Sequence, residues 1–413
     1  MCRVQQLLTR FLVVSLLIQV SAVHAWSASY KILHSFSGQP AGNPSSGLVA
    51  DKAGNGYGTT AAGGPNKAGT VYQLSPKTGF SVIYTFSGPD GRTPQGNLAI
   101  DDAGNLYGTT VNGGDLSACN NLGCGTVFRL SPPTNGSIWS ETVLYSFQGG
   151  TNDGANPKGG VSFDSSGNLF GTTTVGGNQS CQAEGPGCGT VFELRPSGSD
   201  WTEKVIHAFN GNDGGLPQST PVFDTAGNLY AVAGFVFQMS PDGGDGWNFS
   251  VLYFFDPRKG DPTAAQSSIV LDVDGNVYGT SPLGGSQNKG TVFELLLQNG
   301  QWTEKILHDF AGGSDGAQPE AGLAIDADGN LYGTTYAGGS LGFSCSGNGC
   351  GTAFELMPGQ GGQWTERRFA FPKSGSLGIQ PAASLLLDQK GNAYGTTTLD
   401  GPLGEGVVFR ITP

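Results

Sequence analysis

Short apolar runs alternate with polar, glycine-rich segments along the chain, in an order that repeats. Each unit begins with a first apolar run, for which residues 47–50 are an example, and continues with a second, for which residues 105–110 of another unit are an example. After a loop comes a third run such as 125–128, and a fourth run ends in an aromatic residue, as in 302–310. Apolar runs of this length between turn residues predict β-strands, so each unit contains four of them.

A polar motif, Asp-x-x-Gly-Asn-x-Tyr/Phe, separates the first run from the second. The spacing between successive copies is 50, 63, 60, 48, 54 and 62 residues, which suits four short strands with their turns. Asp can accept bonds from the backbone ahead of it and Gly tolerates positive φ, so the motif predicts a tight hairpin turn. Its copies begin at Asp51, Asp101, Asp164, Asp224, Asp272, Asp326 and Asp388.

The strand count predicts how the fold closes. The last unit ends at residue 413 without a fourth strand, whereas a fourth-type strand over residues 30–36 precedes the first unit. Together they complete one blade, so we predict an all-β, seven-bladed β-propeller with four antiparallel strands per blade, closed by its N-terminal strand. An open solenoid is the alternative, but it leaves the extra strand unexplained. The unit at Asp224 lacks the long Gly-Gly loop, which predicts a low point in the rim of the ring.

The N-terminus has the features of a secretory signal. Arg3 and Arg10 precede an apolar run over residues 11–20, and small residues follow at 23–25. We expect residues 1–25 to be a signal peptide and residues 26–413 a single propeller domain, with no membrane span in the mature chain. An uncleaved N-terminal anchor is the alternative. The expected location is secreted, periplasmic or at the cell envelope.

Six cysteines after the signal fall into three close pairs, each just before a Gly-Thr at the same place in a unit. This arrangement predicts loop-stapling disulfides formed in an oxidising compartment. A metal site is the alternative, although no second Cys pair or His cluster lies nearby. The predicted pairs are Cys119 with Cys124, Cys181 with Cys188, and Cys345 with Cys350.

The charge balance argues against nucleic acid as a partner, because the formal net charge is -12 and no basic run is visible. Histidine chemistry is also disfavoured. His34, His207 and His308 occupy one position of the fourth strand, where other units have Tyr or Phe. A position that accepts all three residue types is typical of packing, so we expect no His general base.

The repeat resembles the GloVer tandem-repeat family of exported bacterial proteins. The resemblance rests on Gly-Asn-Leu-Tyr-Gly-Thr-Thr at 104–110 and Gly-Thr-Val-Phe at 125–128, and it covers nearly the whole mature chain. It implies an exported repeat protein and identifies no reaction.

The long loops and the connections between blades are expected to open on one face, where propellers usually bind ligands. Four Asp-Gly pairs lie in these connections, and their acids are candidate ligand-binding residues: Asp90, Asp153, Asp213 and Asp315. They are first of all turn formers, but they could also offer oxygens to calcium or to sugar hydroxyls. No cofactor is otherwise expected.

We therefore predict a monomeric, non-enzymatic binding or envelope-associated module for a carbohydrate or a protein ligand. One alternative is a secreted carbohydrate-active enzyme or lactonase with carboxylates, with or without calcium, at the channel mouth. It would require two or more carboxylates converging on a shared site there. An adhesive surface module is a third class.

Overall fold

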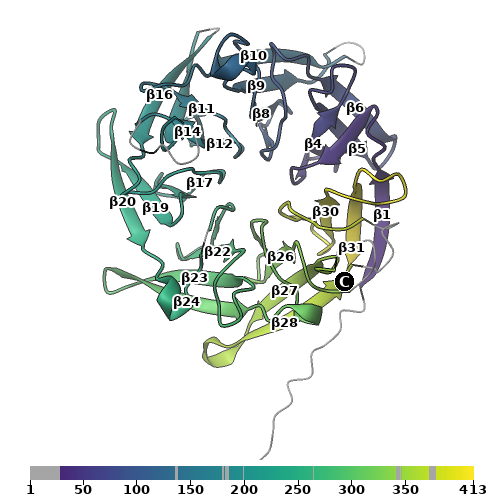
Figure 1. Cartoon of the computed structure of the whole chain (residues 1–413), viewed down its shortest axis with the longest axis vertical. Coiled ribbons are helices and arrows are strands. Elements are labelled where there is room, and N and C mark those ends of the chain that lie inside the picture. Colours follow the sequence, from purple (N-terminus) through teal and green to yellow (C-terminus); the bar gives the residue numbers. More distant parts are fainter. Residues whose placement is uncertain are drawn as a thin grey trace, which may run out of the picture.

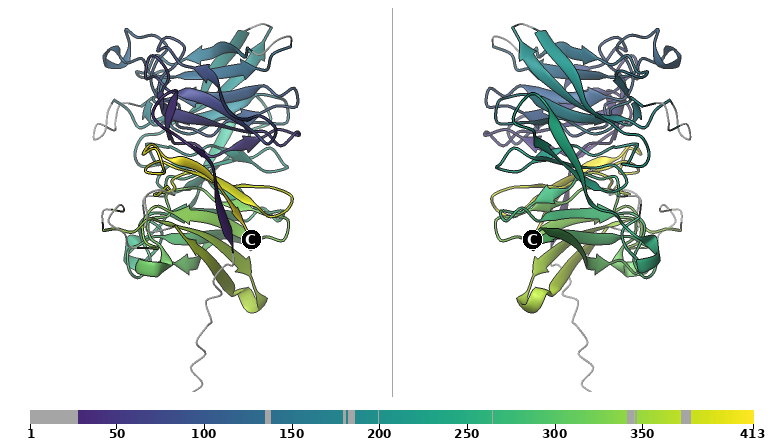
Figure 2. Two further views of the ribbon diagram at one scale, coloured as in Figure 1. Left: turned by 90° about the vertical axis from the view of Figure 1, so that its right-hand side faces the viewer. Right: turned by 90° about the vertical axis from the view of Figure 1, so that its left-hand side faces the viewer.

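Seven β-sheets stand around a central axis and form a ring (Figure 1). The computed structural model describes residues 28–134, 138–178, 181, 186–198, 200–263, 265–340, 345, 347–371 and 378–413. The predicted signal peptide, residues 1–25, lies outside the described residues. Seen from the side, the ring is a thick disc with its sheets stacked face to face (Figure 2). The predicted seven-bladed propeller is confirmed.

Each blade contains four antiparallel strands, ordered from the axis outward. The first strands are β3 (Val49–Ala50), β7 (Ala99–Ile100), β12 (Ser162–Phe163), β17 (Val222–Phe223), β21 (Val270–Leu271), β25 (Ala324–Ile325) and β29 (Leu386–Leu387). The second strands are β4 (Gly56–Gly63), β8 (Leu106–Thr110), β13 (Leu169–Thr173), β18 (Leu229–Val232), β22 (Val277–Ser281), β26 (Leu331–Thr335) and β30 (Ala393–Thr397).

The outer half of each blade holds the longer strands. The third strands are β5 (Thr70–Ser75), β9 (Thr126–Ser131), β15 (Thr190–Ser197), β19 (Val236–Pro241), β23 (Thr291–Gln298), β27 (Thr352–Pro358) and β31 (Val407–Thr412). The fourth strands are β6 (Gly79–Thr85), β10 (Ser140–Ser146), β16 (Asp200–Ala208), β20 (Trp247–Tyr253), β24 (Gln301–Asp309), β28 (Trp364–Ala370) and β1 (Ser29–Ser35). The loop face also carries β2 (Ala41–Pro44), which pairs with β4, and the small hairpin of β11 (Gly154–Ala155) and β14 (Val175–Gly176). Short 3₁₀ turns lie at Cys119–Asn121, Pro257–Lys259, Gly313–Asp315 and Gln360–Gly362.

The two ends of the described chain share one sheet. Strand β1 pairs antiparallel with β31, with Tyr30 opposite Ile411 and Ile32 opposite Phe409. Figure 1 shows this junction, where the purple β1 lies beside the yellow β31. The predicted closure is therefore confirmed. Strand β31 is paired on both sides, with β30 and with β1, so it has no exposed edge.

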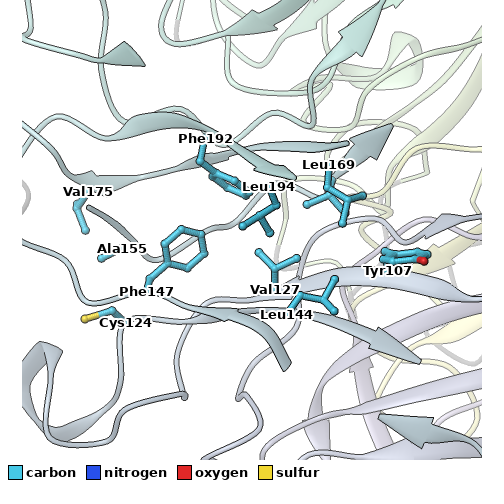
Figure 3. Close-up of a cluster of buried hydrophobic side chains, with 11 residues drawn as sticks. Tyr107, Cys124, Val127, Leu144, Phe147, Ala155, Leu169, Val175, Phe192 and Leu194 are labelled. Atoms are coloured by element: carbon cyan, nitrogen blue, oxygen red, sulfur yellow. The ribbon is translucent and has the colours of Figure 1, made fainter. Parts of the chain in front are cut away.

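Aromatic pairs fill the space between neighbouring blades. A Phe one or two residues after each fourth strand meets an aromatic ring on the third strand of the next blade, as Phe147 meets Phe192 at a centroid distance of 5.1 Å and an angle of 66°. Figure 3 shows this pair within the cluster that blades two and three share. Phe36 makes the same contact with Tyr72 across the closing junction. Edge-to-face geometry adds about 0.5–1.5 kcal/mol to the burial of each pair.

The repeated Asp motif forms the hairpin turn between the first two strands. In Asp101, Oδ1 accepts bonds from the backbone N–H groups of Ala103 and Asn105, at 2.9 and 2.8 Å. Its Oδ2 accepts from the Asn105 amide at 2.7 Å and the Tyr107 hydroxyl at 3.1 Å. All seven copies use the carboxylate in this way, except that Phe170 has no hydroxyl to donate. The motif is structural and lies on the face opposite the long loops.

The predicted low point in the rim is confirmed. Strand β18 ends at Val232 and β19 begins at Val236, so a short turn replaces the long loop of the other blades. No helix in the described part of the chain has the length and apolar character needed to cross a membrane.

Candidate functional site

A cavity of about 440 Å³ lies where the seven blades meet, and its lining includes residues from every blade. Nearly all of these residues lie where the connection from the preceding blade ends and the first strand begins. The cavity therefore opens toward the loop face, opposite the Asp turns. Its lining consists mainly of amides, hydroxyls and backbone groups, with few apolar side chains.

One position in each unit forms a ring around the cavity. In six blades this position directly follows a proline, and in the fifth it follows Ala265. We call these residues the axial ring: Ser45, Gln95, Lys158, Gln218, Gln266, Glu320 and Ala382.

Two recurring contacts place the axial ring. The proline before it packs on the glycine that opens the third strand of the previous blade, and an added Cβ on Gly125 would lie 2.7 Å from Pro157 Cδ. On the other side, the first threonine of the Gly-Thr-Thr motif donates to the backbone of the following blade, as Thr109 Oγ1 does to the Gly159 oxygen at 2.7 Å. Thr396 makes the same bond to Ser46 and closes the circle. Where a blade has the Gly-Thr motifs, they thus help to position the axial-ring residue of the next blade.

Glycines let the inner strands approach each other closely. An added Cβ on Gly96 would lie 2.5 Å from the carbonyl carbon of Gly159, and one on Gly322 would lie 2.6 Å from the Ser268 oxygen. Neither position requires positive φ, so the constraint is the space available between blades.

We expect Gly96→Ala to destabilise the protein by about 1–3 kcal/mol, because overpacking forces the inner strands apart. Urea unfolding followed by tryptophan fluorescence measures this loss. Gly244→Ala is the matched control, since its added Cβ would meet Asp242 Oδ1 at an ordinary 3.4 Å in an exposed turn. Equal midpoints for both variants would contradict the close approach.

The axial ring contains one cation and one anion. Burial at the cavity raises the pKa of Glu320, and burial, followed by the Glu320 charge, raises the pKa of nearby Tyr336. Between these charges lie neutral groups: Gln218 Nε2 donates to Gln266 Oε1 at 3.1 Å. Among the described residues that line the cavity, Glu320 is the only carboxylate and Lys158 the only cation.

Sequence reasoning missed Lys158 and Glu320. The residue type at the axial position differs from blade to blade, so it produces no repeated motif. The signal that was present is the proline before it, which marks one position in six of the seven units.

The four predicted Asp residues lie in the connections between blades and do not line the cavity. Each carboxylate accepts backbone N–H bonds from its own turn, as Asp153 does from Gln148 and Gly154, both at 2.6 Å. Each also meets the Tyr or His of the preceding fourth strand: Tyr84–Asp90, Tyr145–Asp153, His207–Asp213 and His308–Asp315. A fifth such acid, Asp261, accepts from Tyr253 but precedes proline, so the Asp-Gly signal missed it. These contacts are structural, and ligand binding by the four stays a prediction.

Glutamates of the following blade face four of these acids. We call them the junction glutamates: Glu141, Glu203, Glu304 and Glu366. Burial, and then the charge of the facing Asp, raises the pKa of Glu203 to about 8. The same kind of environment raises the pKa of each of the other three to about 7, although His308 and Arg368 oppose the rise at Glu366.

His308, Asp315 and Glu366 bring ligand atoms within 4.8 Å of one another. Arg368 already donates to Asp315 and lies 3.4 Å from Glu366 Oε2, so a cation of the chain itself meets both carboxylates. The set also includes an imidazole, which calcium does not favour. Calcium binding stays a prediction. His34 and His207 stack on Phe80 and Phe249, at centroid distances of 3.5 and 4.0 Å, as expected for a packing position.

All three predicted cysteine pairs are joined as disulfides, with Cα–Cα distances of 5.2, 5.0 and 5.0 Å. Each staples a loop between the second and third strands, on the same face as the cavity mouth. Local disulfides of this kind are typical of proteins that fold in an oxidising compartment.

The sheets and the cavity define a seven-bladed β-propeller with a polar axial site. More particularly, the chain belongs to the Gloeobacter/Verrucomicrobia repeat family, whose sequence model matches residues 20–233 and 231–413. The predicted resemblance is therefore confirmed. No curated protein matches this sequence.

Several solved structures are similar at low identity. One is a luciferin-regenerating enzyme, with 11% identity, coverage of 94% of this chain and 95% of that chain, and a TM-score of 0.44. A protein described as a 6-phosphogluconolactonase from Bacteroides uniformis has 11% identity, coverage of 81% and 86%, and a TM-score of 0.48. The extracellular domain of a one-component system from B. thetaiotaomicron has 12% identity, coverage of 92% and 39%, and a TM-score of 0.52. These similarities show the fold alone.

Proposed function

We propose that this protein is an exported, non-enzymatic binding module that holds a carbohydrate in the axial cavity. The observation that carries the proposal is the lining: amide and hydroxyl side chains from five of the seven blades converge on about 440 Å³ at the loop face. Ligand sites of small molecules have volumes of roughly 300–1,000 Å³ and use a few placed polar groups for orientation. Amide and hydroxyl groups can both donate to and accept from sugar hydroxyls.

The concave shape favours a small ligand over a protein, since protein interfaces of standard size bury about 800 Å² on each partner. Hydrolysis of a glycosidic bond or a lactone by paired carboxylates receives no support from the lining. Glycosidases place two carboxyl groups about 5–9.5 Å apart across the bond that is cleaved, and Glu320 is the only acid among the described lining residues. Export is supported by the three disulfides.

The test is a glycan array on residues 26–413, followed by calorimetry with the best binder. We expect Gln218→Ala/Gln266→Ala to weaken binding about 10- to 100-fold, because two hydrogen-bonding amides leave the cavity together. Gln301→Ala is the matched control, as this exposed residue begins the outermost strand of blade five and should leave affinity unchanged. An array without binders, or equal affinities for the double variant and wild type, would contradict the proposal.

A further inference from the structure

The two charged residues of the axial ring restrict the chemistry of the ligand further than the polar lining of the cavity does. Lys158 belongs to the third blade and Glu320 to the sixth, so two blades separate them on one side of the ring and three on the other. Their blades therefore lie on roughly opposite sides of the ring. Neither forms an ion pair with any described residue.

A charge in a partly desolvated cavity is stabilised when an opposite charge and further hydrogen bonds meet it. A neutral ligand leaves both Lys158 and Glu320 without a partner, and a ligand with one charge satisfies only one of them. A molecule with a carboxylate at one end and an amino group at the other satisfies both. The neutral side chains between them, such as Gln218 and Gln266, can then hold its hydroxyl or amide groups.

We infer that the ligand of the axial cavity is dipolar, with its carboxylate bound by Lys158 and its amino group bound by Glu320. The inference rests on the proposed function, because it assigns charges to the ligand of the same cavity. Burial raises the pKa of Glu320, and an amino group bound beside its carboxylate would favour the charged form again. Two sources share this chemistry: a disaccharide of an amino sugar and a uronic acid, and a short peptide with free termini.

Calorimetry with five probes tests the inference. The dipolar probes are glucosaminyl-glucuronic acid and triglycine, which distinguish the sugar source from the peptide source. The controls are neutral diacetylchitobiose, cationic chitobiose and anionic digalacturonic acid. We expect one of the dipolar probes to bind at least 10-fold more tightly than every control. If triglycine alone binds, the dipolar inference stands and the carbohydrate assignment is wrong.

Three variants test which residue binds the carboxylate of the ligand and which binds its amino group. Lys158→Met and Glu320→Gln are each expected to weaken the dipolar probe at least 10-fold, and they should leave thermal stability unchanged because both side chains border solvent. Lys158→Glu/Glu320→Lys exchanges the charges across the axis. It should restore most of the binding, since a dipolar ligand can enter in the reverse orientation.

Two results would overturn the inference in distinguishable ways. If diacetylchitobiose binds as tightly as the dipolar probes, and neither single variant changes this, the cavity binds a neutral sugar and only the charge assignment fails. If none of the five probes binds and the glycan array is also empty, the proposed function fails with it.

Discussion

Deletion of residues 26–36 is expected to abolish cooperative folding. Without β1, the six paired residues of β31 become an exposed edge, and the seventh blade keeps three strands. The deletion also removes Tyr30, which stacks on Phe369 and Phe409, and Phe36, which is 1% exposed. Losing one buried Phe typically costs about 3–5 kcal/mol, and a whole domain is stable by only about 5–15 kcal/mol.

Calorimetric melting and size-exclusion chromatography measure this result, and we expect no sharp transition and a large aggregated fraction. A chain that lacks only residues 1–25 is the control and should melt cooperatively. Phe36→Ala is a milder version that should cost about 3–5 kcal/mol, because its ring meets Tyr72 of the first blade across the junction. A deletion variant that melts as the control does would show that the ring does not depend on this strand.

Stability is expected to fall by roughly 2–4 kcal/mol between pH 6.5 and pH 9. The cause is the junction glutamates, which ionise near pH 4.3 in an unfolded chain but keep their protons to about pH 7 or 8 when folded. Within this window the folded state binds more protons than the unfolded state, so rising pH favours unfolding. The stabilisation is complete below about pH 4 and lost above the folded pKa.

His34 acts in the opposite direction at lower pH. Burial lowers its pKa to about 4, so it favours unfolding as the pH falls below the ~6.5 of an exposed imidazole. Above pH 6.5 this contribution is absent, which is why the window begins there.

Urea unfolding at several pH values measures the slope, and Glu203→Gln isolates one group. Its amide can donate a hydrogen bond as a protonated carboxyl does, without ionising beside Asp153. We expect this variant to be more stable than wild type by about 1–2 kcal/mol at pH 9 and to have a flatter profile. Asp274→Asn removes an exposed carboxylate as the matched control. A wild-type profile that is flat from pH 6.5 to 9 would contradict the assignment.

Most of the fold could be predicted from local sequence because each unit repeats its own turn chemistry. The Asp-x-x-Gly-Asn motif contains every group that its hairpin needs, from Asp101 to Tyr107. The unmatched strand predicted at residues 30–36, observed as Ser29–Ser35, was enough to predict closure, since a strand with an apolar face requires a partner. The disulfides could be predicted because the paired cysteines are only five or seven positions apart and occupy the same place in their units.

The candidate site could not be predicted in the same way. The acids of the Asp-Gly pairs were predicted as ligand-binding candidates because the pairs repeat in the connections between blades. In the structure their carboxylates bond to their own turns and to neighbouring Tyr or His side chains. The axial ring does not repeat in residue type, and its successive members lie roughly 50 to 60 positions apart in sequence; Gln218 and Gln266, for example, are 48 positions apart. Similarly, the sequence around Glu203 does not distinguish it from an exposed strand residue. Its pKa is raised because the preceding blade buries it.

By itself, then, the sequence determined the strands, the turns, the number of blades and the closing junction, because those features depend on residues close together in the chain or on a periodic count. Only the tertiary structure decided which side chains face the axis and which carboxyls lose water between blades. Those properties come from the ring as a whole: it brings one residue from each of seven units to a single cavity, and it places acids of adjacent blades side by side.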